Sequence, residues 1–203
     1  SSRKWISQIT GRLAKTKMSR WMIPHFIRVY GIDADEAEKS TGDYGSLNDF
    51  FTRRLKTGAR PLTEDENVLI SPVDAKISGI GPIDGKELTN IKGQRYVLEE
   101  LLHHSPRAVN YKNGFFIVLY LSPTDYHRIH SPVTATIVEQ EHLPGKVYPV
   151  NDFALRHMPR VLSRNERKIS YLQHQYGELA MVKVGALNVS SIQYIPHLPE
   201  QVE

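Results

Sequence analysis

Hydrophobic positions change their spacing partway along the chain. Near the start they recur every three or four residues, as at Ile9 and Leu13 and again at Phe26 and Tyr30. This period predicts two amphipathic helices. A break near residues 16–19 is expected to separate them.

Short apolar runs separated by Pro and Gly replace this pattern from about residue 67 onward. Such runs, rich in β-branched and aromatic residues, are typical of β-strands. We therefore predict an α+β fold in which N-terminal amphipathic helices precede a mostly antiparallel β core. The run at 115–121 is apolar throughout and predicts a strand buried on both faces. The predicted strands cover residues 68–70, 75–80, 115–121, 134–139, 169–174 and 179–184.

A further short helix is predicted between these two parts. Ser46 can cap a helix whose apolar side chains, including Leu47, Phe50 and Leu55, fall on one face. Arg53 and the arginine after it would lie near the C-terminal end, where cations are favoured.

Charge is distributed unevenly along the 203 residues, which carry 26 Lys and Arg against 22 Asp and Glu, a net charge of +4. The segment 1–32 contains basic side chains and no acidic one. A basic helical surface carrying Trp and Phe is typical of helices that lie on anionic lipid. We expect 1–32 to associate with a membrane ahead of a main domain at 33–203. Alternatively, the helices pack on that domain with their basic faces in water. We expect neither a bilayer-spanning helix nor a signal peptide, because no apolar run is long enough.

A polar cluster follows the predicted strand 115–121 directly. Tyr126, His127, Arg128 and His130 come after a Ser-Pro turn, where a rigid strand would hold them at the rim of a site. Histidine is the side chain most easily tuned to exchange protons near neutral pH. Two other interpretations stay open, namely surface histidines in a loop and a metal-binding pair. No metal site is expected, because the chain has no cysteine and neither histidine has an adjacent Glu.

Three more charged side chains are candidates for chemistry. Asp74 lies between a proline turn and a predicted strand, a position where Asp is ordinarily a turn former. Arg164 and Arg167 flank an Asn-Glu pair, and either guanidinium could hold a phosphate or a carboxylate with two hydrogen bonds. The alternative is an internal Arg-Glu ion-pair network that supports the β core.

Several separated segments together resemble phosphatidylserine decarboxylases, the pyruvoyl-dependent enzymes that make phosphatidylethanolamine. Residues 120–132 read Tyr-Leu-Ser-Pro-Thr-Asp-Tyr-His-Arg-Ile-His-Ser-Pro and resemble the family signature. Asp74 matches the Asp of the family's Pro-x-Asp-Gly motif, with Ala75 in place of its Gly. The remaining matches are Phe-Phe-Thr-Arg at 50–53, Lys-Gly-Gln-Arg-Tyr-Val-Leu at 92–98, Arg-Asn-Glu-Arg at 164–167 and Val-Gly-Ala at 184–186.

The resemblance implies a self-cleaving proenzyme. Asp74 would support His130, and His130 would deprotonate a serine downstream of Glu203 for attack on the chain's own backbone. Cleavage would leave that serine as a covalent pyruvoyl cofactor on a small α subunit, and this chain would be the large β subunit. The cofactor would form a Schiff base with phosphatidylserine and accept electrons as carbon dioxide leaves (EC 4.1.1.65). His127 is expected to act in decarboxylation, and which histidine protonates which intermediate stays open.

The same resemblance implies a set of contacts and partners. Tyr126 and Arg128, together with Arg164 and Arg167, are expected to bind the substrate, phosphatidylserine. The expected partners are the small α subunit, an anionic membrane surface and a second αβ unit in a homodimer, with no nucleic acid among them. The enzyme would be peripheral, on the cytoplasmic face of the cell membrane.

Two other functions stay open on sequence alone. A Ser-His-Asp hydrolase could use Ser190 or Ser191 with His130 and Asp74, although no Gly-x-Ser-x-Gly elbow occurs. A non-catalytic basic protein could bind anionic lipid at a membrane surface. The chain itself could be the large product of self-cleavage, a truncated form or an inactive relative.

Overall fold

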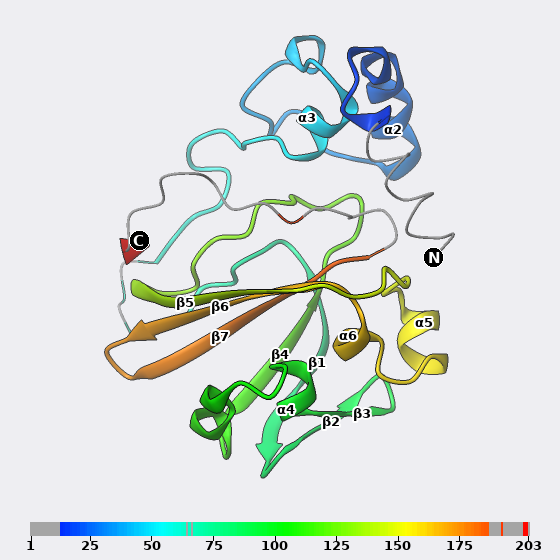
Figure 1. The fold of residues 1–203 in the computed structure, drawn as a ribbon. Coiled ribbons are helices and arrows are strands. Elements are labelled where there is room, and N and C mark those ends of the chain that lie inside the picture. Colours follow the sequence, from blue (N-terminus) through cyan, green and yellow to red (C-terminus); the bar gives the residue numbers. More distant parts are fainter. Residues whose placement is uncertain (1–12, 64, 66, 187–191, 193–200, 203) are drawn as a thin grey trace.

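The computed structural model describes residues 13–63, 65, 67–186, 192 and 201–202 (Figure 1). It is an α+β structure, as predicted, with short helices first and antiparallel sheets after them. The helices are η1 (Lys17–Met22), α2 (Ile23–Tyr30), η2 (Thr41–Asp43), α3 (Leu47–Phe51), α4 (Leu98–Leu101), η3 (Pro106–Tyr111), α5 (Asp152–His157) and α6 (Val161–Arg164). The strands are β1 (Lys76–Asp84), β2 (Glu87–Ile91), β3 (Gln94–Val97), β4 (Phe115–Tyr120), β5 (Ala135–Leu143), β6 (Arg167–His174), β7 (Gly177–Val184) and β8 (Gln201–Val202).

The N-terminal helices follow the predicted break. The chain turns after Ala14, and the second predicted helix begins as the 3-10 helix η1 before continuing as α2. Gly31 ends α2 in the left-handed conformation (φ 63°), which Gly adopts without a Cβ clash. The first predicted helix falls mainly within residues 1–12, outside the described part of the chain.

Helix α3 begins as predicted but is shorter. The Ser46 hydroxyl accepts a hydrogen bond from the backbone N–H of Asp49 at 3.1 Å, which is an N-cap. The helix ends at Phe51, and Leu55 instead lies in an isolated β-bridge with Ala37. This bridge ties the segment after α3 to the turn after α2. Ala37 belongs to a small apolar cluster that also contains Phe50 of α3.

Two four-stranded antiparallel sheets form the main domain, in the orders β3-β2-β1-β4 and β7-β6-β5-β8. A shared hydrophobic core joins them, with Ile83 and Ile91 contributed by the first sheet and Ile169 and Tyr171 by the second. In Figure 1, helices α2 and α3 lie at one end of the molecule and the sheets at the other. The loops that precede β1 and follow β4 pass between these two parts.

Three strand predictions need correction. Residues 68–70 form no strand, and Val68 and Leu69 are largely exposed. The structure adds β2 and β3, which the sequence did not predict because polar residues interrupt their apolar pattern. Strand β4 is not buried on both faces, since Phe115 is 79% exposed and Ile117 56% exposed.

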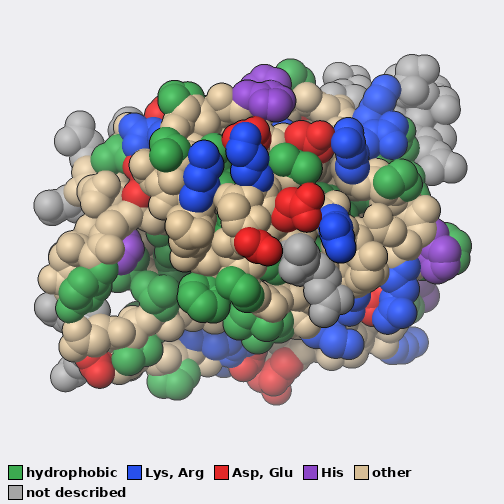
Figure 2. Space-filling model, turned by 90° about the horizontal axis from the view of Figure 1, so that it is seen from below, with side chains coloured by type: hydrophobic (Ala, Val, Ile, Leu, Met, Phe, Trp, Pro, Cys, Tyr) green, Lys and Arg blue, Asp and Glu red, His purple; other side chains and the backbone are tan. Residues whose placement is uncertain are grey.

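One face of the β1-β4 pair is therefore apolar and open. Ile117 lies directly opposite Ile80, which is also exposed, so these side chains form a continuous patch with Phe115. Within the described residues β4 is also the edge of its sheet. Figure 2 views the molecule from the end that contains these strands. Hydrophobic side chains gather there next to a surface that carries both basic and acidic side chains.

Candidate active site

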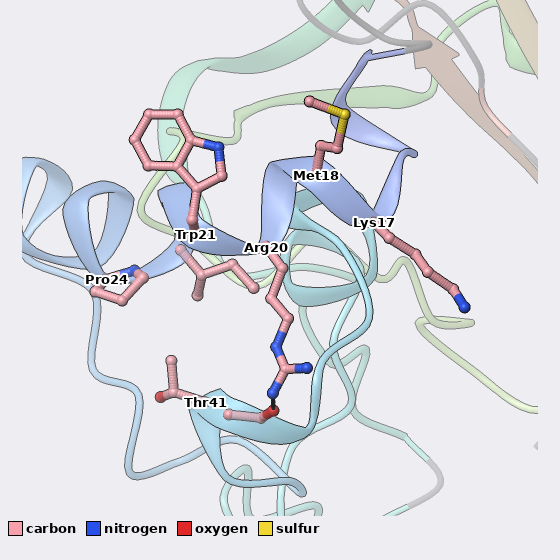
Figure 3. Close-up of a pocket in the computed structure, with 8 residues that line it drawn as sticks. Lys17, Met18, Arg20, Trp21, Pro24 and Thr41 are labelled. Atoms are coloured by element: carbon pink, nitrogen blue, oxygen red, sulfur yellow. Dashed lines mark hydrogen bonds between the residues drawn. The ribbon is translucent and has the colours of Figure 1, made fainter.

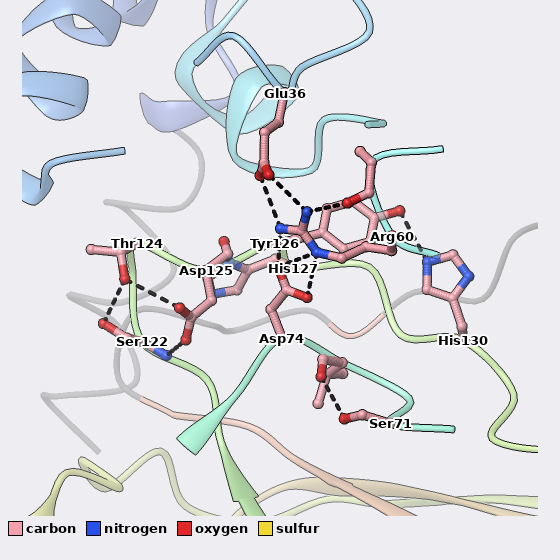
Figure 4. Close-up of polar contacts among 12 residues, drawn as sticks. Glu36, Arg60, Ser71, Asp74, Ser122, Thr124, Asp125, Tyr126, His127 and His130 are labelled. Atoms are coloured by element: carbon pink, nitrogen blue, oxygen red, sulfur yellow. Dashed lines mark hydrogen bonds and ion pairs between the residues drawn. The ribbon is translucent and has the colours of Figure 1, made fainter. Parts of the chain in front are cut away.

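The candidate site is built where β1 begins and β4 ends. Because these strands are antiparallel, with Lys76 opposite Tyr120, the loop before β1 lies beside the loop after β4. Backbone hydrogen bonds fix the contact between the two loops, from His130 N to Pro72 O (2.9 Å) and from Ile70 N to Pro132 O (3.0 Å). Asp74 in the first loop is thereby held near the histidine cluster in the second (Figure 4).

Asp74 is bound by an arginine that the sequence did not identify as a site residue. The Nε and Nη2 atoms of Arg60 donate to the Asp74 carboxylate at distances of 2.6–3.1 Å. The same guanidinium donates to both carboxylate oxygens of Glu36 at 2.8 and 2.9 Å. Arg60 thus connects the turn after α2 with the loop before β1, and Figure 4 shows it between the two carboxylates.

Arg60 also keeps both carboxylates ionised. Its side-chain hydrogen bonds are the main cause that lowers the pKa of Asp74 and of Glu36 below their ordinary values. A hydrogen bond from the backbone of Tyr126 lowers the pKa of Asp74 further. Asp74 is therefore an anion facing the histidine loop.

The predicted support of His130 by Asp74 is not a direct hydrogen bond in this structure. Asp74 directs its oxygens to Arg60, and Nε2 of His130 lies 3.0 Å from the hydroxyl of Tyr126. Asp74 acts on His130 through its charge, which raises the pKa of the imidazole. Burial and the nearby Arg128 oppose this and lower the pKa overall, so His130 is neutral at pH 7.

His127 is held in one tautomer. Its Nδ1 lies 2.8 Å from the backbone carbonyl oxygen of Asp125. A carbonyl can only accept a hydrogen bond, so Nδ1 carries the proton and Nε2 has a free lone pair. The ring packs on Phe51 with 3.9 Å between centroids, and burial lowers the pKa of His127. His127 is consequently a neutral, fixed imidazole.

Side chains of the loop itself maintain its shape. The Asp125 carboxylate accepts a hydrogen bond from Ser122 N at 2.6 Å, and Asp125 N donates to Ser122 O at 3.0 Å, which closes a tight turn directly after β4. Arg128 donates from Nε to the carbonyl of Thr52 at 2.9 Å and so attaches the loop to the end of α3. Tyr126 is buried, and this burial raises the pKa of its phenol, so the hydroxyl stays protonated.

Arg164 and Arg167 make no contact with this cluster in the described residues. Arg167 lies in β6 and is 4% exposed, and it donates to four backbone carbonyls, those of Glu100, Leu101, Ser163 and Asn165. Its donors are used inside the core, which favours an internal support over substrate binding. The support consists of hydrogen bonds to carbonyls rather than the ion pairs considered from sequence.

Arg164 lies nearby on the surface. Its guanidinium stacks on the ring of Tyr148, 5.2 Å from the centroid, and it borders a shallow groove with Gly145 and Lys146. Within the described residues, no group of three or more His, Cys, Asp or Glu side chains could hold a metal ion. Ser190 and Ser191 lie outside the described residues.

Comparison with known proteins identifies the family of the chain. The family model described as phosphatidylserine decarboxylase matches residues 47–203. The phosphatidylserine decarboxylase proenzyme of Halalkalibacterium halodurans is 42% identical over 204 residues, covering 100% of this chain and 78% of the relative. The proenzyme of Bacillus mycoides is 38% identical (95% of this chain, 73% of the relative), and that of Brevibacillus brevis is 40% identical (93% and 68%).

Proposed function

We propose, from the premise that this chain belongs to the phosphatidylserine decarboxylase family, that it forms the large chain of a pyruvoyl enzyme converting phosphatidylserine to phosphatidylethanolamine. The observation that carries the proposal is the contact between two loops. It brings an ionised Asp74 near the neutral His130, in the loop that also carries the neutral His127, at the paired ends of β1 and β4. Acid-base chemistry requires such groups to be close and unequal in charge.

The residues present fit a pyruvoyl group. When bound, that group supplies a carbonyl that accepts the electrons released as carbon dioxide leaves, which no ordinary side chain can do. His127 Nε2 has a free lone pair and is our candidate for the atom that carries the proton in decarboxylation. The fixed Nδ1–H and the Phe51 ring hold that atom in one orientation.

His130 and Asp74 are proposed to act in self-cleavage. A neutral His130 can accept the proton of an attacking serine hydroxyl, and the negative charge of Asp74 stabilises the imidazolium that forms. The serine oxygen then replaces the backbone nitrogen on the preceding carbonyl, and elimination of the resulting ester separates the two chains. Nε2 of His130 lies 3.0 Å from the Tyr126 hydroxyl, so the proton is accepted at Nδ1, or at Nε2 once Tyr126 has moved.

The small chain is proposed to cover the open face of β1 and β4. Phe115, Ile117 and Ile80 form an apolar patch, and the edge of β4 leaves backbone groups available for another strand. Exposed patches and edges of this kind are covered in stable proteins. A homodimer of two-chain units, implied by the family, stays a prediction.

Membrane association is proposed through η1 and the start of α2. Met18 is 81% exposed and Trp21 76% exposed, and both border an open groove of about 700 Å³ with Lys17 and Arg20 (Figure 3). Apolar side chains flanked by cations are suited to an anionic lipid surface. None of the helices in the described residues is both long and apolar enough to cross a bilayer. The cytoplasmic face of the cell membrane is the proposed location.

The decarboxylation assay tests this function against the two rivals. Processed enzyme should release carbon dioxide from phosphatidylserine and produce an equal amount of phosphatidylethanolamine, and His127→Ala should abolish both while vesicle binding persists. A pure lipid-binding protein would release no carbon dioxide in either form. A hydrolase would instead release a fatty acid or a free headgroup.

A further inference from the structure

Two side-chain donors of a buried arginine near the candidate site have no hydrogen-bond partner among the described residues. Arg53 follows α3 and is 4% exposed, yet its Nε and Nη1 atoms donate to no described residue. The guanidinium instead lies over the ring of Phe50, 5.0 Å from the centroid. Leaving a buried charge without a partner costs several kcal/mol in typical proteins. Such a group is expected to meet an anion at some stage of function.

The nearby carboxylates do not fill this role. Asp74 and Glu36 lie near enough to influence Arg53 electrostatically, but both direct their oxygens to Arg60. Arg60 therefore has two carboxylate partners, and Arg53 has none among the described residues.

Arg128 adds a second positive charge beside Arg53. It donates from Nε to the carbonyl of Thr52, the residue before Arg53, and pairs with no carboxylate among the described residues. Both arginines lie near enough to Tyr126 to act on the pKa of its phenol, and each lowers it. Two guanidiniums that pair with no carboxylate among the described residues thus lie near the neutral histidines.

We propose that Arg53, assisted by Arg128, binds the phosphodiester of the lipid headgroup. This inference rests on the proposed function and adds a substrate contact to it. In a guanidinium, Nε and the neighbouring Nη2 present two parallel N–H groups that match two oxygens of a phosphate, and Nη1 can donate to a further acceptor. The stacking on Phe50 holds this plane in place before the substrate arrives.

The alternative anion of the substrate, its carboxylate, fits less well. Loss of carbon dioxide removes that negative charge, so a cation bound to it would stabilise the substrate more than the transition state and slow the reaction. The phosphodiester keeps its charge throughout. A contact with it is uniform binding, which lowers KM and leaves kcat nearly unchanged.

The experiment compares Arg53→Gln and Arg53→Lys with the wild type in the processed two-chain enzyme. Arg95→Gln is the matched control, because Arg95 is an exposed arginine on β3. Two soluble probes are titrated by calorimetry below their micelle-forming concentrations. Dihexanoyl phosphatidylethanolamine has an amine and a phosphodiester, and O-hexanoyl serine has an amine and a carboxylate. Intact mass reports self-cleavage, and thermal unfolding reports folding.

We expect Arg53→Gln to weaken binding of the phosphodiester probe about 10- to 100-fold and to leave binding of the serine ester within about twofold of wild type. KM for short-chain phosphatidylserine should rise similarly with kcat retained, and Arg53→Lys should be intermediate. Self-cleavage should proceed, since it involves no phosphate.

Three results for Arg53→Gln would overturn the inference. These are an equal loss of affinity for both probes, a loss of affinity for the serine ester alone, and no loss of affinity for either probe. If Arg53→Gln does not fold, Arg128→Gln must show the same selective loss of the phosphodiester probe. Failure of the proposed function is distinguishable, because the wild type would then show neither cleavage nor decarboxylation.

Discussion

Two buried arginines of this chain have opposite environments. Arg167, in the β core, donates to four backbone carbonyls, and two of these belong to the C-terminal end of α4, where cations are favoured. Arg53, beside the histidine loop, is equally buried, but its side-chain Nε and Nη1 atoms donate to none of the described residues. The first arrangement is complete without a ligand and the second is not. Both arginines are buried, so burial does not distinguish a structural from a functional arginine here. The difference is whether the guanidinium N–H groups already have acceptors in the folded chain.

The largest expected effect is at Arg167. Arg167→Met should lower the free energy of unfolding by about 3–5 kcal/mol, because four carbonyls lose their partner inside the core. Urea unfolding at pH 7 measures this, with Arg95→Met as the control for loss of an exposed positive charge. A loss no larger than that of the control would remove the distinction between the two arginines.

Arg53→Met should have the opposite sign. Removing an unpartnered buried charge is expected to raise the free energy of unfolding by about 1 kcal/mol, since the methionine sulfur still packs on Phe50. The same urea titration, without lipid, gives the answer. A large destabilisation would mean that Arg53 already has a partner in the folded protein and would weaken the case for a phosphate subsite.

Arg60→Gln is expected to have an intermediate effect, with a loss of about 1 kcal/mol at pH 7 for a partly exposed network. In the unfolded chain the carboxyl groups of Asp74 and Glu36 have pKa values of 3.8 and 4.5, and folding lowers both. The ionised carboxylates therefore stabilise the folded state at higher pH, and this stabilisation is lost as the pH falls through the folded pKa values. The variant should therefore lose less stability than the wild type between pH 5 and pH 3. If the free energy of unfolding fell equally with pH in the variant and the wild type, Arg60 would not be the cause of the lowered pKa values of these carboxylates.

The smallest effect concerns His127. Its pKa is lowered from 6.5, so the unfolded chain takes up a proton first and stability falls as the pH drops below 6.5. His127→Gln should remove this slope, a change of less than about 1.4 kcal/mol for each pKa unit. Unfolding titrations at pH 7 and pH 5 measure it. A steeper slope in the variant would contradict a neutral, buried His127.

Much of the fold could be predicted from local pattern. The apolar runs identified β1 and β4 to β7, and Ser46 marked the start of α3. Strands β2 and β3 were missed because Glu87–Ile91 and Gln94–Val97 mix polar and apolar residues, and their pairing depends on the turn at Gly93. The open face of β4 could not be predicted, because an apolar run does not reveal what covers each side.

The candidate site was predictable where it is local and not where it depends on distant contacts. The histidine cluster and Asp74 stand in recognisable stretches. Arg60 meets Glu36 and Asp74 across 24 and 14 residues, and only the folded chain brings them together. Arg53 was predicted as a helix-end cation, and its missing partners are visible only in three dimensions.

The most direct test of the whole account is denaturing intact-mass spectrometry of the enzyme expressed from its complete natural reading frame. The account predicts two chains, a large one containing residues 1–203 and a small one whose N-terminus is blocked as a pyruvoyl group. His130→Ala should give one uncleaved chain. A wild-type protein that remains a single chain with a free N-terminus, and still decarboxylates phosphatidylserine, would contradict the account.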